Sequence, residues 1–354
     1  MALLPATLRR IIRFFAAEYF VVRGAEKGSD SPVSVLWSGT QQQLAYFQDR
    51  IFGCNSVAIS RVGRRPMVLT DSLMTQFDCS FCVIILKQQF VSLLRRPRDF
   101  CLPLWVHCIV PLNDEREYAK SDSLREDLRH IRNAKLSWKL SEKLDDFDFF
   151  YENIYVPTIT ASHGRSALPA SYENRLHKFR SGTMKLLQVT RDDQFVAGVT
   201  IDFENDVPTL RDSGVLNGSP EIKKTGAMSA TYLFAMDYLA SKGYPNVCFG
   251  ASRSFLDDGV LNYKRKFRPV ISTGSDDDVL MRIHSLDEPT RSMLRDSPCL
   301  TWQDRKLHRT YFRDPSENHS EHQNRKNRGD WRFGIDAESV FDVSGDALRL
   351  LTTQ

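Results

Sequence analysis

Lys223, Lys224, Thr225, Gly226 and Ala227 form a short basic stretch with a glycine, and they lead into a segment whose apolar residues recur at helical spacing. The first turn of such a helix offers free backbone N–H groups and the positive end of the helix dipole. A phosphate group fits there, and the two lysines would add charge. The alternative is an ordinary capped helix with two solvated lysines.

Two other groups of side chains could take part in chemistry. His163 lies in a Ser-His-Gly turn after an aromatic-rich segment, and a histidine there can act as a base toward an amine or bind substrate, because its pKa lies near neutrality. An ordinary surface histidine is the alternative. Arg129 and Arg132 lie on one side of a helix predicted from Leu124, where they could hold a phosphate or a carboxylate. Such a face is more often simply solvated.

The composition is that of an ordinary globular protein, with 354 residues, 42% hydrophobic content and a formal net charge of +4. The length is enough for two domains. The mild positive charge does not indicate DNA as a partner, but it suits an anionic donor such as an acyl-CoA or a charged tRNA. No Ser-His-Asp order, Walker motif or dinucleotide-binding glycine pattern is visible.

Seven cysteines, an odd number without a secretory signal, predict reduced thiols in a cytoplasmic protein. Cys79 and Cys82 have C-x-x-C spacing and are followed by Cys101 and by His107 or Cys108, which gives a faint likeness to a zinc site. These cysteines lie within apolar runs and no second C-x-x-C pair follows. We therefore expect core cysteines and no metal.

Residues 1–20 place apolar side chains on one helical face with arginines beside them. Arginines and Glu18 interrupt any apolar run, so this stretch is neither a secretory signal nor a membrane span. We expect a helix packed on the body of the protein. Contact of this helix with a membrane surface is the alternative.

The helices and strands around the basic stretch can be predicted from the spacing of apolar residues and from residues that begin or end helices. A good helix start at Ser219 to Glu221 means that the helix could begin before the glycine. Asn246 to Gly250 reads as a buried strand, and Asp257 or Asp258 can cap the helix that follows. Two strands predicted over 184–189 and 195–201 flank a polar turn and form a hairpin.

The N-terminal half reads as a further α/β region. Val33 to Trp37 is predicted as a strand and Thr40 to Phe52 as a helix, and Cys82 to Leu86 is a very apolar strand. A helix is also predicted over Ser171 to Arg180, and a core helix over 144–160.

The order of these motifs resembles the C-terminal half of a GNAT-type acyltransferase domain, and especially the Fem-type branch with its exopolysaccharide-cluster relatives. The likeness rests on the glycine turn into a helix, the strand, the polar loop and a D-G-V-L-x-Y-K-x-K-F helix. Upstream, residues 128–134, 146–155 and 162–164 are similar to that branch as well. The resemblance spans 123–315, a little over half of the chain.

The resemblance implies an α/β fold, with a mixed sheet flanked by helices, that is GNAT-like and is either one catalytic lobe or two GNAT-like lobes. The domains expected from it are an N-terminal helix and linker (1–30), an α/β lobe (31–120), the catalytic domain (121–315) and a polar linker with a C-terminal tail (316–354).

The resemblance also assigns roles. Acyl-CoA would be a co-substrate held at the Lys223 to Ala227 turn, and Tyr263 would protonate the leaving thiolate. Arg253 and Lys264 are assigned to anionic parts of either substrate. The chain departs from the usual acyl-CoA turn at its outer positions, which are Lys223 and Met228.

Three functions follow as expectations. The first is an N-acyltransferase that moves an acyl group from acyl-CoA or an acyl-carrier protein to an amine in envelope, polysaccharide or small-molecule biosynthesis. The second keeps the fold but takes an aminoacyl group from aminoacyl-tRNA. The third is a non-catalytic binding protein on the same fold.

Overall fold

A computed structural model describes residues 17–96, 99–112, 121–163, 169–273, 277–303, 306–315, 335–345 and 347–353. Most of the N-terminal helix predicted over 1–20 lies outside these residues. The prediction is wrong for Ala17 to Phe20, which begin a strand. Their burial alternates from one residue to the next, so the period here is that of a strand.

The chain divides into two compact units that interleave along the sequence. Unit 1 comprises 1–106, 252–262 and 273–354, and unit 2 comprises 107–251 and 263–272. The chain thus passes repeatedly between the units. The contiguous boundaries expected from the sequence stay predictions.

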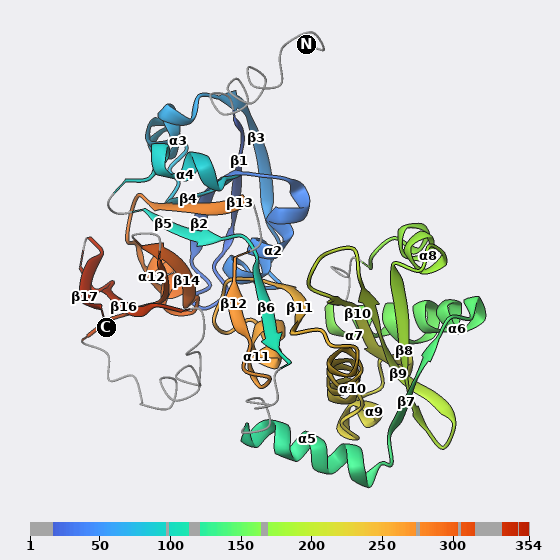
Figure 1. Cartoon of the computed structure of the whole chain (residues 1–354). Coiled ribbons are helices and arrows are strands. Elements are labelled where there is room, and N and C mark those ends of the chain that lie inside the picture. The colour runs from blue at the N-terminus through green and yellow to red at the C-terminus, as the bar shows by residue number, and fades with distance from the viewer. Residues whose placement is uncertain are drawn as a thin grey trace. The chain divides into compact units, whose positions relative to one another are not determined.

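Unit 1 is built on a six-stranded mixed sheet in the order β3-β1-β2-β4-β13-β5 (Figure 1). The strands are β1 (Ala17–Ala25), β2 (Pro32–Ser38), β3 (Ala58–Arg65), β4 (Phe81–Lys87), β5 (Phe100–Pro103) and β13 (Asp277–Ile283). The helices of this unit include α2 (Gln41–Ile51), α3 (Thr70–Gln76), α4 (Gln88–Leu94) and α12 (Glu288–Arg295), with the short 3-10 helix η1 (Met67–Leu69). Strand β13 pairs antiparallel with β4 on one side and β5 on the other, so a late segment fills the middle of an early sheet.

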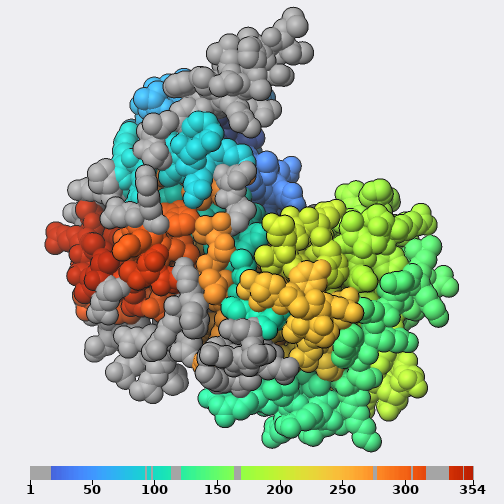
Figure 2. Space-filling model, viewed as in Figure 1, coloured from blue at the N-terminus to red at the C-terminus, as the bar shows by residue number. Residues whose placement is uncertain are grey.

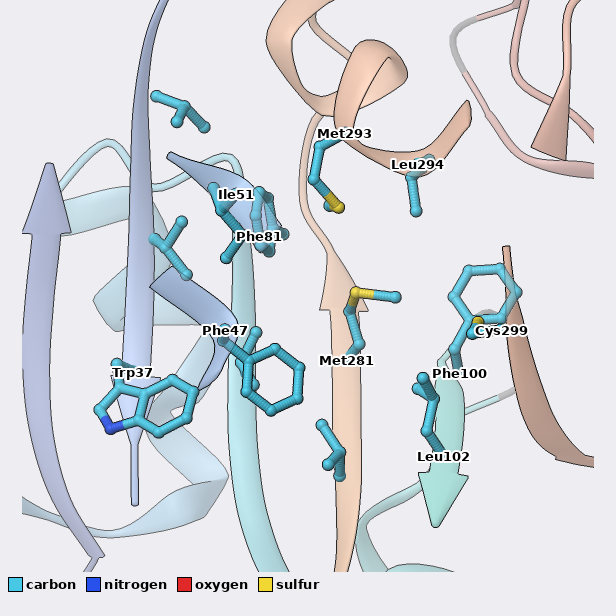
Figure 3. Close-up of a cluster of buried hydrophobic side chains, with 14 of the residues drawn as sticks. Trp37, Phe47, Ile51, Phe81, Phe100, Leu102, Met281, Met293, Leu294 and Cys299 are labelled. Atoms are coloured by element: carbon cyan, nitrogen blue, oxygen red, sulfur yellow. The ribbon is translucent and has the colours of Figure 1, made fainter. Parts of the chain in front are cut away.

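One hydrophobic core of unit 1 forms where α2 and α12 meet this sheet. Figure 3 shows Trp37, Phe47 and Phe81 converging with Met281 and with side chains of α12. Thr40 caps α2 in a capping box, with its hydroxyl accepting from Gln43 N at 3.2 Å. The predicted strand at 33–37 and helix at 40–52 are confirmed.

A second sheet of unit 1 is four-stranded and contains the C-terminal residues. Its order is β14-β15-β16-β17, with β14 (Cys299–Gln303), β15 (Lys306–Arg313), β16 (Ala337–Asp342) and β17 (Arg349–Thr353). Phe312 and Phe341 of this sheet stack at 6.0 Å between ring centroids, and each lies 5.1 Å from the ring of Phe100. Strands β15 and β16 therefore pack against the core of unit 1, whereas β17 is exposed.

Unit 2 is built on a seven-stranded mixed sheet in the order β12-β6-β11-β10-β9-β8-β7. The strands are β6 (Val106–Pro111), β7 (Ser137–Ser141), β8 (Met184–Arg191), β9 (Gln194–Asp202), β10 (Thr209–Val215), β11 (Asn246–Ser252) and β12 (Val270–Ser272). Strands β8 and β9 form the predicted hairpin, and its turn residues Asp192 and Asp193 have φ of 48° and 63°.

Helices surround this sheet. They are α5 (Asp122–Asn133), α6 (Leu144–Phe149), α7 (Val156–His163), α8 (Tyr172–Arg180), α9 (Pro220–Lys224) and α10 (Ala227–Ser241), with a π-helix η3 (Phe150–Tyr155) joining α6 to α7 and a 3-10 turn η5 (Leu216–Gly218) before α9. Helix α11 (Gly259–Arg265) begins in unit 1 and ends in unit 2. The predicted mixed sheet flanked by helices is thus confirmed. No helix among the residues that the structure describes has the length and apolar content to cross a bilayer.

Candidate active site

Strands β10 and β11 separate in the middle of the unit 2 sheet. They are parallel neighbours, and their described residues share one register pair, Thr209 with Cys248, supported by Cys248 N donating to Pro208 O at 2.8 Å. No further register pair joins the described residues of the two strands. On its other side, β10 carries a bulge between Leu210 and Ser213 in its pairing with β9. The sheet therefore opens beside a distorted strand.

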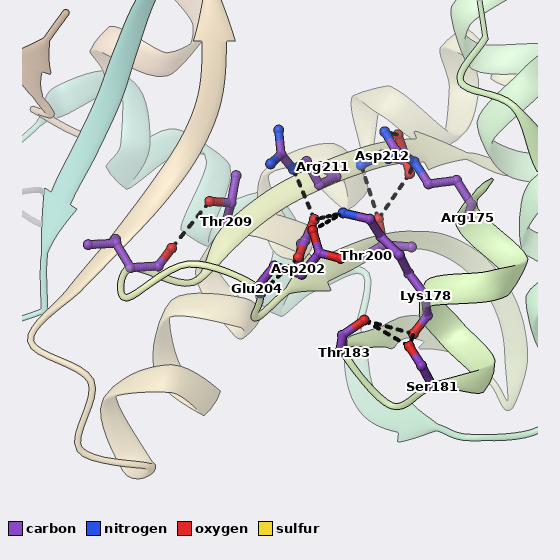
Figure 4. Close-up of polar contacts among 11 residues, drawn as sticks. Arg175, Lys178, Ser181, Thr183, Thr200, Asp202, Glu204, Thr209, Arg211 and Asp212 are labelled. Carbon is purple, nitrogen blue, oxygen red and sulfur yellow. Dashed lines mark hydrogen bonds and ion pairs between the residues drawn. The ribbon is translucent and has the colours of Figure 1, made fainter. Parts of the chain in front are cut away.

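Buried carboxylates hold the bulge of β10 in place (Figure 4). Asp212 lies 2.7 Å from the guanidinium of Arg175 on α8, and it accepts a hydrogen bond from the hydroxyl of Thr200 at 3.2 Å. The same hydroxyl accepts from Asp212 N at 3.1 Å. The bulge is thus fixed by a charge pair and by two hydrogen bonds to the neighbouring strand. Sequence reasoning missed these residues, because nothing in the local pattern marks a bulge.

A second carboxylate, Asp202, lies beside the bulge on β9. Lys178 Nζ lies 2.9 Å from Asp202 Oδ2, and Arg211 Nε lies 3.4 Å from the same oxygen. Burial acts to raise the pKa of Asp202, but the hydrogen bond from Lys178 and the nearby positive charges lower it overall. Asp202 therefore stays ionised and positions Arg211 beside the opening of the sheet.

The predicted donor turn connects two helices. The helix after the glycine, α10, begins at Ala227 and not earlier. Ser219 caps a separate short helix, α9, by accepting from Ile222 N at 3.3 Å, and Lys223 and Lys224 form its last turn. Gly226 then reverses the chain with φ of +80°. A Cβ at Gly226 would lie 3.0 Å from Ile131 of α5, so both the backbone conformation and the close approach require glycine.

Helix α5 packs against the start of α10, as Figure 1 and the space-filling view in Figure 2 show. Gly226 and Ala227 are buried there, whereas Lys224 is exposed. In the first turn of α10, Ser229 Oγ donates to Asp127 Oδ2 of α5 at 2.7 Å. The carboxylate of Asp127, which belongs to α5, therefore contacts the first turn of α10, where the sequence predicts a phosphate.

Two residues of the segment after β11 complete this cluster. Lys266 Nζ donates to Asp127 Oδ2 at 2.6 Å and to Ser229 Oγ at 2.7 Å. The hydroxyl of Tyr263 lies 3.1 Å from Ser229 Oγ, and Lys266 Nζ lies 3.8 Å from the centre of the Tyr263 ring. The structure thus brings Tyr263 and the predicted turn together.

Burial shifts the pKa of both side chains. Burial, and then the neighbouring Tyr232, raise the pKa of Tyr263 well above its ordinary value, so this phenol stays protonated. Burial also lowers the pKa of Lys266, and Asp127 opposes that shift. A protonated phenol is what a general acid requires.

The four residues predicted to bind anionic substrate are spread over the molecule. Arg129 and Arg132 lie on the exposed side of α5, and Arg129 is 3.9 Å from Glu126. Arg253 belongs to unit 1, where its guanidinium lies over the ring of Tyr46 at 4.8 Å. Lys264 is buried in unit 2. Its Nζ donates to the carbonyls of Gly250 at 3.1 Å and of Ala251 at 2.9 Å, which ties the end of β11 in place.

His163 is the last residue of α7, and its side chain lies outside the described residues, as does Gly164. Helix α7 itself is held against β10 by Thr158. Thr158 Oγ1 donates to Val215 O at 3.0 Å and accepts from Val215 N at 2.9 Å, which fixes α7 against the end of β10. The predicted role of His163 stays a prediction.

No protein-family model matches the chain. No curated protein sequence matches it either. Among solved structures, the chain is similar to L-PGS from Bacillus licheniformis, with 13% identity, a TM-score of 0.39 and coverage of 78% of this chain and 85% of that one. It is also similar to FemX, with 11% identity, a TM-score of 0.38 and coverage of 75% and 88%.

A third similar structure is an aminoglycoside acetyltransferase, meta-AAC0020, from an uncultured soil metagenomic sample. It has 16% identity and a TM-score of 0.30, and the match covers 39% of this chain and 90% of that one. At these TM-scores the candidate site rests on the geometry of unit 2, namely the opening between β10 and β11 and the cluster at the start of α10.

Proposed function

We propose that this chain is an N-acyltransferase that moves an acyl group from a thioester donor, acyl-CoA or an acyl-carrier protein, to an amine. The observation that carries the proposal is the opening of the sheet after the Thr209 and Cys248 pair, next to the bulge of β10. An opening of this kind exposes backbone N–H groups that can polarise a carbonyl.

The residues of the cluster take part in the proposed reaction as follows. Tyr263, held at the start of α10 and kept protonated by burial, gives its proton to the leaving thiolate. Lys223 and Lys224 at the end of α9 attract the phosphates of the donor. Arg211, held by Asp202, binds a negative group beside the opening. His163 is proposed to remove the amine proton.

A second donor class is favoured by one observation. Asp127 places a carboxylate in the first turn of α10, and an anion there repels the pyrophosphate of coenzyme A. A donor that does not use this turn, such as aminoacyl-tRNA, avoids that repulsion. The two donors are distinguished by what binds.

The test is the thermal stability of the whole protein with acetyl-CoA, a long-chain acyl-CoA, free coenzyme A and alanyl-tRNA, each in a separate sample. A ligand at about 100 times its Kd should stabilise the folded protein by about 2.7 kcal/mol. A rise with the acyl-CoA ligands supports the thioester donor, and a rise with alanyl-tRNA alone supports the second donor. If none of the four raises the unfolding temperature and an acyl-carrier protein does not donate its acyl group to an amine either, the proposed transferase function is wrong.

An Asp127→Asn variant sharpens the test. If the phosphates of coenzyme A approach the start of α10, removal of this carboxylate should increase the shift caused by free coenzyme A, compared within each protein. Asp122→Asn is the matched control, because Asp122 lies on the same helix and its side chain is 90% exposed. The control should show the same ligand shift as the unchanged protein.

A further inference from the structure

The thiol of Cys248 on β11 lies beside an imidazole. The Sγ atom is 3.7 Å from Nδ1 of His107, which comes from the neighbouring strand β6. Cys248 is 5% exposed, whereas His107 is half-buried. The histidine therefore reaches from a partly open position to a sulfur that water hardly touches. This pair is separate from the cluster at the start of α10.

The backbone of β11 is distorted next to this thiol. Gly250 has φ of +73°, and its N–H donates to Cys248 Sγ at 3.3 Å. A Cβ at Gly250 would lie 3.2 Å from Leu210 O, so a larger residue is disfavoured by both conformation and space. Lys264 holds the carbonyls of Gly250 and Ala251 and so fixes the distortion. Backbone strain of this kind is common at functional sites.

The surroundings suit a thiolate. The N–H of Gly250 donates to the sulfur at 3.3 Å, so a hydrogen-bond donor is in place for the charge that develops when the thiol loses its proton. Burial, and then the positive charges of Arg211 and Lys264, lower the pKa of His107. At neutral pH the imidazole is therefore uncharged and can accept the proton of the thiol.

Other cysteines in the chain differ from Cys248. Burial raises the pKa of Cys82 to about 12 and that of Cys79 to about 11, so these thiols stay protonated. Burial raises the pKa of Cys299 even further. These three serve as buried thiols of the core, while Cys248 has a base and an N–H donor at its sulfur.

The position of Cys248 connects this thiol to the proposed reaction. Cys248 forms the register pair with Thr209 after which β10 and β11 separate, so its backbone lies at the start of the opening. We infer that Cys248 carries the acyl group during turnover, with His107 as its base, and this inference rests on the proposed function. The sulfur attacks the donor carbonyl, and a thioester to Cys248 replaces the bond to the donor.

Each bond change is accompanied by a proton transfer. His107 takes the proton of the thiol, and Tyr263 gives its proton to the leaving group, which is the thiolate of coenzyme A or the ribose oxygen of a tRNA ester. The proton on His107 then restores Tyr263 through solvent. The acceptor amine then attacks the thioester, an amide forms, and the Cys248 thiol is regenerated with the amine proton. No oxidant or reductant is needed, because the acyl group moves unchanged.

The first experiment captures the intermediate. The protein is mixed with acetyl-CoA, or with alanyl-tRNA, without an amine acceptor, quenched in acid and digested for peptide mass spectrometry. We expect one acyl group on the Cys248 peptide that neutral hydroxylamine removes, as it does from thioesters. The adduct should be absent from Cys248→Ala and present in Cys108→Ala, which loses a buried cysteine of the adjacent strand.

The second experiment measures the reactivity of the Cys248 thiol, and its dependence on His107, without any acyl donor. Iodoacetamide modification of the native protein is followed for Cys248, with Cys82 and Cys299 as buried references in the same sample. Cys248 should react faster than both, and His107→Gln should slow it by about 100-fold, the lower range for removal of a general base. The same substitution should leave the rate at the exposed Cys54 unchanged.

The outcomes separate this inference from the proposed function. If a donor binds and an amine is acylated, but no thioester forms and Cys248→Ala keeps its full rate, transfer is direct and the inference is wrong while the function stands. If Cys248 reacts no faster with iodoacetamide than Cys299, the inference is also wrong. If no donor binds at all, the proposed function is wrong. The inference that Cys248 carries an acyl group is then wrong as well, even if the thiol reacts with iodoacetamide.

Discussion

Replacement of Asp127 by asparagine should strongly destabilise unit 2. The Asp127 and Lys266 side chains are 24% and 11% exposed and lie 2.6 Å apart. The removal of one partner of a buried pair costs about 3–5 kcal/mol, because the other charge stays buried without compensation. Since Asp127 keeps some contact with water, we expect the lower end, about 3 kcal/mol.

The assay is thermal and urea unfolding of the whole protein, followed by circular dichroism. About 3 kcal/mol corresponds to a fall in Tm of about 6–12 °C for a unit of this size. Asp122→Asn, which breaks an exposed pair with Arg125 on the same helix, should change stability by about 0.5 kcal/mol or less. Asp127→Asn combined with Lys266→Met should recover much of the loss, because no charge is then left unpaired.

The pH dependence of the stability of Asp127→Asn tests whether the unpaired charge of Lys266 causes the loss. The pKa of Lys266 is already lowered by burial, and the loss of Asp127 lowers it further. Between this folded-state pKa and the ordinary value near 10.5, the unfolded chain binds more protons, so stability rises with pH. The deficit of Asp127→Asn should therefore shrink in alkaline solution. An effect no larger than that of Asp122→Asn, or one independent of pH, would refute the reasoning.

Three further predictions concern other parts of the chain. Gly214→Ala should destabilise the protein by about 2–3 kcal/mol in urea unfolding, because its Cβ would lie 2.5 Å from Ile154 O; Gly259→Ala, whose Cβ meets nothing within 4 Å, should cost little. Tyr263→Phe should lower kcat by about 100-fold with little change in donor KM, and an unchanged kcat would exclude Tyr263 as the acid. Burial raises the pKa of Asp278 to about 6, above its ordinary 3.8, so the native state binds extra protons between these values and loses stability as the pH rises through them. Asp278→Asn should therefore stabilise the protein at pH 7.5 by about 3 kcal/mol, with most of the gain absent at pH 4.

Short sequence motifs predicted the individual helices, strands and turns in which they lie. The capping box at Thr40, the hairpin with its turn at Asp192 and Asp193, and the strand from Asn246 were all readable in a few consecutive residues. The alternative caps of α11 were left open by the sequence. The structure assigns the cap to Asp258, whose carboxylate accepts from Leu261 N at 2.9 Å.

The features that build the candidate site depend on distant parts of the chain. Asp127 meets Lys266 across 139 positions, and His107 meets Cys248 across 141. No pattern in a local window connects such residues. The same reason explains the wrong helix at Ala17 to Phe20, where the apolar spacing fitted a helix and pairing with β2 and β3 decided for a strand.

The place of β13 has a consequence for synthesis on the ribosome. Strands β4 and β5 are complete by residue 103, but the strand that joins them begins at Asp277. During translation of the intervening residues, the apolar edges of β4 and β5 lack their partner, and unpaired edges of this kind promote association between chains. Unit 2 is synthesised in this interval, so most of it can fold before unit 1 is complete. Newly made chains should therefore depend on protection of the first sheet until the ribosome has released β13.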